Sequence, residues 1–138
     1  MSSPEKPYRS RLNLGVSEPS PGIGVIRIQG AVAKWDIEAL NAAIEGLFAR
    51  GVKRIIFDLS ETEIVASGAF GCFIACQNQA AKVEGQILLA GVPDIVRIVF
   101  DRLGLSEMFA FAASTDAALR QLTASRTDKQ GTTRRRKR

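Results

Sequence analysis

A single serine stands among small residues in the stretch VASG, residues 65–68. An apolar, strand-like run precedes this stretch and a helix-like run follows it, so Ser67 falls at a predicted helix N-terminus. A serine hydroxyl there can accept a backbone hydrogen bond and cap the helix. The same place suits a phosphate group, because free N–H groups and the positive end of the helix dipole stabilise added negative charge. Ser67 is therefore either a cap or a phosphorylation site, and Gly68 and Gly71 leave room for a kinase to approach.

The rest of the sequence excludes several other kinds of chemistry. The chain contains no histidine, which rules out Ser-His-Asp and Cys-His catalysis. Cys72 and Cys76 lie four residues apart, so we expect two small buried apolar side chains rather than a disulfide or a zinc site. Neither a P-loop GxxxxGK[ST] nor a GxGxxG motif occurs. We expect no metal and no cofactor, and any general acid–base work would fall to carboxylates or lysine.

Positive charge is concentrated in the last five residues, RRRKR. The formal net charge is +5, and without these residues the chain has 14 basic and 14 acidic residues. The folded part is therefore not a basic surface. We expect residues 126–138 to be a disordered basic tail that aids solubility and can add weak electrostatic contact with phosphate-bearing partners. Direct DNA binding is not expected.

The N-terminal residues 1–21 are rich in serine, proline and charge, which predicts a flexible segment. The run LNLGV within it has room for one edge strand, and EPSPG, residues 18–22, is expected to stop regular structure. No window holds the roughly 20 unbroken apolar residues of a membrane span. The N-terminus also lacks the apolar core of a secretory signal, so we expect a cytoplasmic protein.

Strand-like and helix-like segments alternate in residues 22–125, which we expect to form one domain. Short apolar runs predict strands at 23–30, 53–60 and 86–92, with a short edge strand at 108–112. Apolar residues at three- and four-residue steps predict helices at 36–51, 68–85, 93–104 and 114–125. Asp36 is the expected N-cap of the first helix. This alternation is typical of βαβ units, which place the strands in a largely parallel sheet.

The order of these parts resembles the STAS domain, a family named for sulphate transporters and anti-sigma factor antagonists. The stretches VIRIQG, RIIFDLSETEIVASGAFG and EGQILLAGVPDIVRIVFDRLGLSEMF carry the resemblance, together with the helix between the first two, and cover roughly residues 22–122. The resemblance implies an α/β fold: a four- to five-stranded mixed, mostly parallel sheet with about four helices packed mainly on one face. It also implies binding rather than catalysis, so we expect no catalytic residue and a protein that is not an enzyme.

In anti-sigma factor antagonists of this family the loop usually reads Asp-Ser-Ser-Gly, and the second serine accepts a phosphate. On this chain Ser67 takes the acceptor place and Gly68 the glycine. Val65 stands where the family has Asp, Ala66 where it has the first Ser, and Ala33 where a further Asp is common. Two acidic residues that usually lie near the acceptor are therefore absent. The implied partners are an anti-sigma factor, which is a GHKL-type serine kinase, and a phosphatase that resets the switch.

The resemblance implies a partner-binding surface around the Ser67 loop and the neighbouring start of the first helix. The residues that we expect to form it with Ser67 are Gly68, Ala69, Phe70, Asp58, Ser60 and Trp35. Asp58 has a structural alternative, because an Asp at a strand end can order a turn through backbone N–H groups. Trp35 can staple the helix start or anchor a partner.

Three function classes stay open after these observations, of which a small enzyme or nucleotide-binding protein is the least favoured, because neither nucleotide-binding motif occurs. The first is a phosphorylation-controlled regulator that binds an anti-sigma factor. The second is a STAS subunit without phosphorylation, attached to a lipid ABC transporter or to a signalling scaffold. We favour the first class, and the missing acidic residues and the apolar loop support the second.

Overall fold

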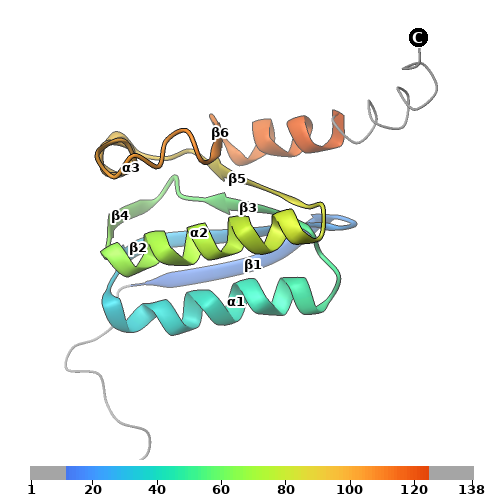
Figure 1. The fold of residues 1–138 in the computed structure, drawn as a ribbon, viewed down its shortest axis with the longest axis horizontal. Coiled ribbons are helices and arrows are strands. Elements are labelled where there is room, and N and C mark those ends of the chain that lie inside the picture. The colour runs from blue at the N-terminus through green and yellow to red at the C-terminus, as the bar shows by residue number, and fades with distance from the viewer. Residues whose placement is uncertain (1–11, 125–138) are drawn as a thin grey trace, which may run out of the picture.

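The computed structural model describes residues 12–124, in which strands and helices alternate (Figure 1). The elements are β1 (Asn13–Ser20), β2 (Ile23–Val32), the 3-10 turn η1 (Lys34–Asp36), α1 (Ile37–Ala49), β3 (Arg54–Asp58), β4 (Thr62–Val65), α2 (Ser67–Lys82), β5 (Gln86–Ala90), α3 (Asp94–Arg102) and β6 (Ala110–Ala112). Residues 115–124 are helical. The start of the predicted flexible segment, residues 1–11, and the predicted basic tail, 126–138, lie outside the described residues.

The strands form one six-stranded sheet in the order β1-β2-β3-β5-β6, and β4 pairs with β2 off this path. β1 is antiparallel to β2, and the other pairs among the described strands are parallel. The predicted mixed, mostly parallel sheet is confirmed, with six strands instead of four to five. Because parallel strands end at the same edge of a sheet, the segments that follow β2, β3, β5 and β6 gather at one end of the molecule.

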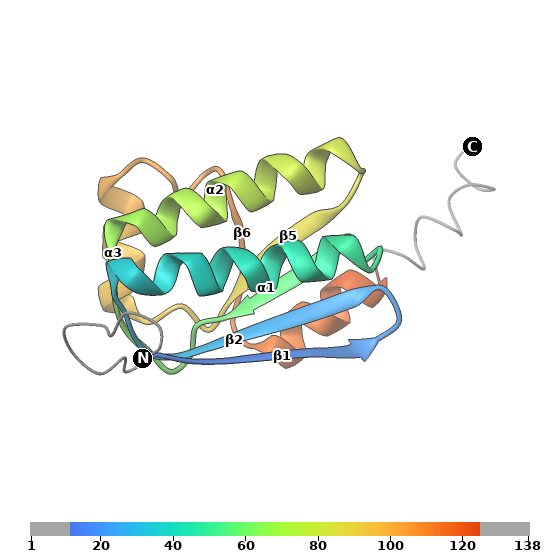
Figure 2. The same cartoon turned by 90° about the horizontal axis from the view of Figure 1, so that it is seen from below.

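Two apolar clusters lie on opposite faces of the sheet, because side chains alternate along each strand. On β3, Ile55 and Phe57 belong to the larger cluster and Ile56 to the smaller one. The larger cluster is covered by α1, α2 and α3, and the smaller one by residues 115–124. Figures 1 and 2 show α1 and α2 side by side on one face and the 115–124 helix on the other. The prediction of helices mainly on one face is confirmed, and no described helix is long and apolar enough to cross a membrane.

β4 occupies a segment for which the sequence predicts only a loop. Val65 pairs with Val32 near the end of β2, and the buried Thr62 donates its hydroxyl hydrogen to the carbonyl oxygen of Ile28 at 2.7 Å. The pairing joins segments about thirty residues apart, and a four-residue strand has too short a pattern to indicate such a partner. β4 leads directly into α2 and therefore fixes where α2 begins.

β1 continues beyond the expected edge strand into the EPSPG stretch that was expected to stop it. The strand runs through Glu18 and Pro19 to Ser20, and its register with β2 shifts between Ser17 and Ser20. Proline lacks the N–H group that a central strand needs, but an edge strand with a bulge tolerates it. The prolines therefore produce an irregular edge instead of a strand end.

The two cysteines of α2 are free and buried, as the sequence predicts. Burial raises the pKa of Cys72, and burial together with the neighbouring Cys72 raises the pKa of Cys76 from 9.0 to about 12. No cluster of three or more potential metal ligands occurs among the described residues. The cysteines are packing residues of the larger cluster.

We expect both thiols to resist alkylation by iodoacetamide in the folded protein at about pH 8, because the thiolate is the reactive form. In denaturant both should react quickly. A thiol whose pKa is raised on folding stabilises the folded state below its unfolded pKa, and this contribution is lost as the pH rises from 9.0 towards about 12. Mass spectrometry after timed labelling measures the rate, and equal rates with and without denaturant would contradict the burial of these residues.

Candidate functional site

The carboxyl ends of β2 and β4 lie side by side and hold the Ser67 segment in place. The N–H group of Ala66 donates to the carbonyl oxygen of Val32 at 2.8 Å, directly beyond the pair formed by Val32 and Val65. Ala33 follows Val32, and Ser67 follows Ala66. The two positions at which the family usually carries carboxylates, Ala33 and Val65, therefore lie in the same corner as Ser67.

Ser67 is the first residue of α2 and is exposed, and Ala66 occupies the N-cap position. Ala66 has extended backbone angles (φ −64°, ψ 147°), and no side-chain hydrogen bond caps this helix in the described part of the chain. The alternative of Ser67 as a helix cap is therefore wrong. No acidic residue lies in the first turn of α2, so the positive end of its dipole faces no carboxylate of that turn. The arrangement leaves an accessible hydroxyl at a place that stabilises negative charge.

The next three residues anchor the start of α2 against the rest of the fold. Gly68 is exposed, and a Cβ atom there would lie 3.5 Å from the side chain of Ile37, at the start of α1. Ala69 and Phe70 are 0% and 3% exposed. We expected the side chains of Ala69 and Phe70 to contact a partner, but both are buried. They pack in the larger apolar cluster below Ser67. Gly68 remains available at the surface.

Asp58 and Ser60 form the turn that joins β3 to β4. Asp58 Oδ1 accepts hydrogen bonds from the backbone N–H of Ser60 at 3.0 Å and from its hydroxyl at 2.7 Å. This is the structural alternative for Asp58, and it is confirmed. Gly91, with φ at +64°, lies so close that an added Cβ would approach Ser60 Cβ to 2.9 Å. The turn is thus held between the ends of β3 and β5, and Ser60 is exposed at the same end of the sheet as Ser67.

Asp36 and Trp35 lie in the short turn that begins after Ala33. Asp36 is 2% exposed, and its Oδ2 accepts a hydrogen bond from the backbone N–H of Ala33 at 2.8 Å. Asp36 takes the expected N-cap position of α1, but its side chain makes no capping bond to that helix. Trp35 is half-buried, with the Lys34 ammonium 5.8 Å from its ring centroid. Both roles considered for Trp35, staple and anchor, remain compatible with this position.

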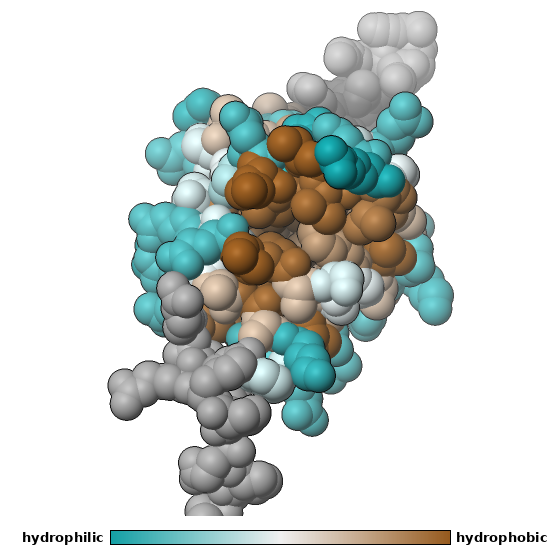
Figure 3. Space-filling model, turned by 90° about the vertical axis from the view of Figure 1, so that its left-hand side faces the viewer, coloured by the Kyte–Doolittle hydropathy of each residue, from teal (hydrophilic) through white to brown (hydrophobic). Residues whose placement is uncertain are grey.

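Exposed apolar side chains close to the Ser67 segment were not anticipated from the sequence. Ile64 is 65% exposed on β4, and Ile95, Ile98 and Val99 are 64%, 49% and 38% exposed on α3. We call these four residues the apolar end surface. Figure 3 shows apolar side chains gathered across this end of the molecule, with hydrophilic residues around them. The 95, 98, 99 spacing on a helix was the available signal, because Val96 and Phe100 already supply the buried stripe.

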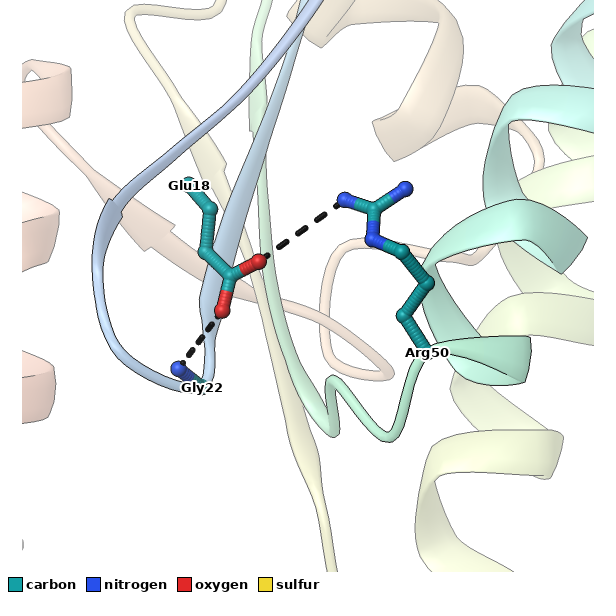
Figure 4. A network of polar contacts seen from close by, with 3 residues as sticks. All are labelled: Glu18, Gly22 and Arg50. Atoms are coloured by element: carbon teal, nitrogen blue, oxygen red, sulfur yellow. Dashed lines mark hydrogen bonds and ion pairs between the residues drawn. The ribbon is translucent and has the colours of Figure 1, made fainter.

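A separate polar network lies where β1 turns into β2, away from this end (Figure 4). The carboxylate of Glu18 accepts a hydrogen bond from the backbone N–H of Gly22 at 3.0 Å, and its other oxygen lies 3.7 Å from Arg50 Nη2 at the end of α1. Gly22 adopts φ +83°, which suits glycine in a tight turn. The network closes the β1–β2 turn and brings no residue to the Ser67 segment.

The STAS domain family matches residues 16–118. The chain belongs to this family. Among the curated relatives of the STAS chain is BtrV of Bordetella bronchiseptica, which is assigned as an anti-sigma factor antagonist. BtrV is 27% identical over 97 residues, which is 70% of this chain and 84% of BtrV. The family resemblance drawn from the VASG stretch and its neighbours is confirmed.

Solved structures with the same fold include anti-sigma factor antagonists. Unphosphorylated SpoIIAA superposes with a TM-score of 0.74 at 20% identity, over 81% of this chain and 97% of SpoIIAA. The Bacillus cell fate determinant SpoIIAA in its phosphorylated form gives 0.67 at 20% identity, over 80% and 99%. An antagonist from Mycobacterium paratuberculosis gives 0.72 at 22% identity, over 80% and 92%. At these identities the likeness establishes the fold of the STAS chain.

Proposed function

We propose that this STAS protein is an anti-sigma factor antagonist that binds a serine-kinase anti-sigma factor and is switched by phosphorylation of Ser67. In the unphosphorylated state it occupies the GHKL-type kinase, and the sigma factor is released to act in transcription. A phosphatase removes the phosphate and resets the switch. The role needs no catalytic residue in this chain, and it needs no direct DNA binding.

The observation that carries the proposal is that Ser67 is exposed and does not cap α2. It lies exposed at the first position of α2, while the backbone of Ala66 supplies the N-cap. The hydroxyl is therefore not used for capping and is accessible to a kinase. Support also comes from the relatives: BtrV is assigned as an antagonist, and SpoIIAA is known in unphosphorylated and phosphorylated forms.

The proposed step is an ordinary phosphoryl transfer from ATP. Ser67 Oγ forms a bond to the γ-phosphorus, the bond to the β–γ bridging oxygen breaks, ADP leaves, and the hydroxyl proton passes to a base of the kinase. The phosphate adds about 1.5 to 2 negative charges at neutral pH. Beside exposed apolar side chains, this charge would have to be stripped of water if the partner stayed in place. Phosphorylation should therefore release the partner.

A binding experiment with ATP tests the proposal. The purified protein is mixed with each GHKL-type kinase encoded in its own genome, and complexes are measured by size-exclusion chromatography. We expect one kinase to form a complex that ATP and Mg²⁺ dissolve, and we expect Ser67→Ala to form a complex that ATP leaves intact. Ser17→Ala is the matched control, since Ser17 is an exposed hydroxyl on the edge strand β1, where it pairs with Val25 away from the Ser67 segment, and should behave as wild type. If no kinase binds, or if ATP dissolves the Ser67→Ala complex, the proposal fails.

A STAS subunit without phosphorylation is the second candidate function. It is favoured by Val65 and Ala33, which replace the carboxylates that usually accompany the acceptor serine. In this case the protein is a constitutive component of a lipid ABC transporter or of a signalling scaffold. A complex from cells whose composition is unchanged in both Ser67→Ala and Ser67→Glu would favour this candidate.

A further inference from the structure

The apolar end surface leaves four large aliphatic side chains in contact with water at one end of the molecule. Its four side chains, Ile64, Ile95, Ile98 and Val99, are each more than a third exposed. On α3, Ile95, Ile98 and Val99 form a second apolar stripe in addition to the buried Val96 and Phe100. Contiguous patches of this kind on soluble proteins mark surfaces that bind other molecules.

This surface is continuous with the Ser67 segment. α3 contacts β4, which carries Ile64, and β4 continues through Ala66 into Ser67. On the other side, Phe100 of α3 packs against Phe70 in the first turns of α2, with ring centroids 4.8 Å apart. α3, β4 and the start of α2 therefore pack together at one end of the molecule.

From this continuity, and resting on the proposed function, we infer that the apolar end surface is the docking site for the kinase, which presents an apolar face to it. A kinase that phosphorylates Ser67 has to bring its active site to the Ser67 hydroxyl and must cover the side chains beside it. The chemistry of those side chains is aliphatic, because Val65 and Ala33 replace the usual carboxylates and Ile64 projects from β4. The kinase binds by burying these isoleucine and valine side chains, and phosphorylation of Ser67 releases it.

Photo-crosslinking in the protein's own cells tests this assignment. The photo-reactive amino acid p-benzoyl-L-phenylalanine replaces Ile98 in one variant and Gln121 in a matched control. Gln121 is exposed on the helical residues 115–124, which cover the opposite face of the sheet. We expect the Ile98 variant to give an adduct with a protein that contains a GHKL-type ATPase domain, identified by mass spectrometry. The Gln121 variant should not give this adduct, and adding Ser67→Glu to the Ile98 variant should abolish it.

Each other outcome overturns the assignment. An adduct between two copies of this chain would make the surface a self-association site. An adduct with a protein that lacks an ATPase domain, or no adduct, would show that the kinase does not dock here. The phosphate on Ser67 is measured in the same cultures, so the two proposals are separated. Phosphate without the kinase adduct removes only the docking site, whereas the kinase adduct without phosphate removes only the switch.

The crosslinked kinase then allows a quantitative measurement. Ile98→Lys should weaken its binding about tenfold or more, the usual cost of losing one well-packed apolar anchor. Gln121→Lys adds the same charge and should leave the affinity unchanged. Because apolar contacts are not screened by salt, the wild-type affinity should change little between low and high salt. An affinity that falls steeply with salt, or that is unchanged in Ile98→Lys, would contradict docking through this surface.

Discussion

Replacing Gly85 by alanine should destabilise the protein by roughly 3 kcal/mol or more, at the upper end of what overpacking costs. A Cβ atom built on Gly85 would lie 2.1 Å from the carbonyl oxygen of Lys53 and 3.0 Å from its carbonyl carbon. Both are backbone atoms, so no side-chain rotation relieves the clash.

The clash falls where β5 begins to pair with β3. The same Lys53 oxygen accepts a hydrogen bond from the N–H group of Gln86 at 3.0 Å, next to the first parallel pair, Arg54 with Gln86. The backbone N–H group of Gly85 also donates a hydrogen bond to the carbonyl oxygen of Ala80, in the last turn of α2. An added methyl group must push α2 and β5 away from β3, and this movement breaks the central pairing of the sheet.

Urea denaturation followed by circular dichroism measures the effect of Gly85→Ala. Total stabilities of about 5 to 15 kcal/mol are usual, so the midpoint should fall severely or the variant should not fold. Gly46→Ala is the matched control, because a Cβ at Gly46 meets nothing within 4 Å inside α1. It should instead raise the stability by about 0.5 to 1 kcal/mol. A Gly85→Ala midpoint equal to that of wild type would contradict the close approach of these segments.

Truncating Phe100 to alanine should cost about 3 to 5 kcal/mol, the range for removing a fully buried aromatic side chain. Phe100 is 0% exposed. Its ring lies at the centre of an aromatic cluster, with centroids 4.8 Å from Phe70, 6.2 Å from Phe73, and 5.7 Å from both Phe109 and Phe111. A cavity here removes contacts of α3 with α2 and with the β6 edge at once.

The same variant also tests how the candidate site is supported. Phe70 lies three residues after Ser67, so the loss of the Phe100 ring should increase hydrogen exchange in the first turns of α2. Ile98→Ala provides the control, because Ile98 is on the same helix but 49% exposed and should change the stability by less than about 1 kcal/mol. Equal destabilisation by Phe100→Ala and Ile98→Ala in urea would show that the aromatic cluster does not hold these elements together.

Local patterns in the sequence were sufficient to predict most of the fold. The apolar runs around Ile55 and Leu88 became central strands, and glycines such as Gly51 and Gly85 follow helices as expected. β4 could not be predicted, because its four residues are ordered by a partner strand about thirty residues away. The EPSPG stretch predicts a stop in regular structure, but β1 runs through Pro19 because an edge strand tolerates proline.

The candidate site was predicted in position but less well in its details. Ser67 falls at the start of α2 as expected, yet only the structure shows that Ala66 occupies the cap position and leaves the hydroxyl exposed. Ala69 and Phe70 follow the serine in sequence, but the helix turns both side chains into the core. Ile64 and the outer stripe of α3 come together only through tertiary packing, which the spacing of either segment alone does not indicate.

The most direct test of the switch is the intact mass of the protein purified from its own cells under several growth and stress conditions, with fragment mapping. We expect part of the protein to carry one phosphate, on the fragment that contains Ser67, and the Ser67→Ala variant to carry none. The same mass in every condition, with Ser67 unmodified, would contradict the switch and leave the STAS protein as a constitutive binding subunit.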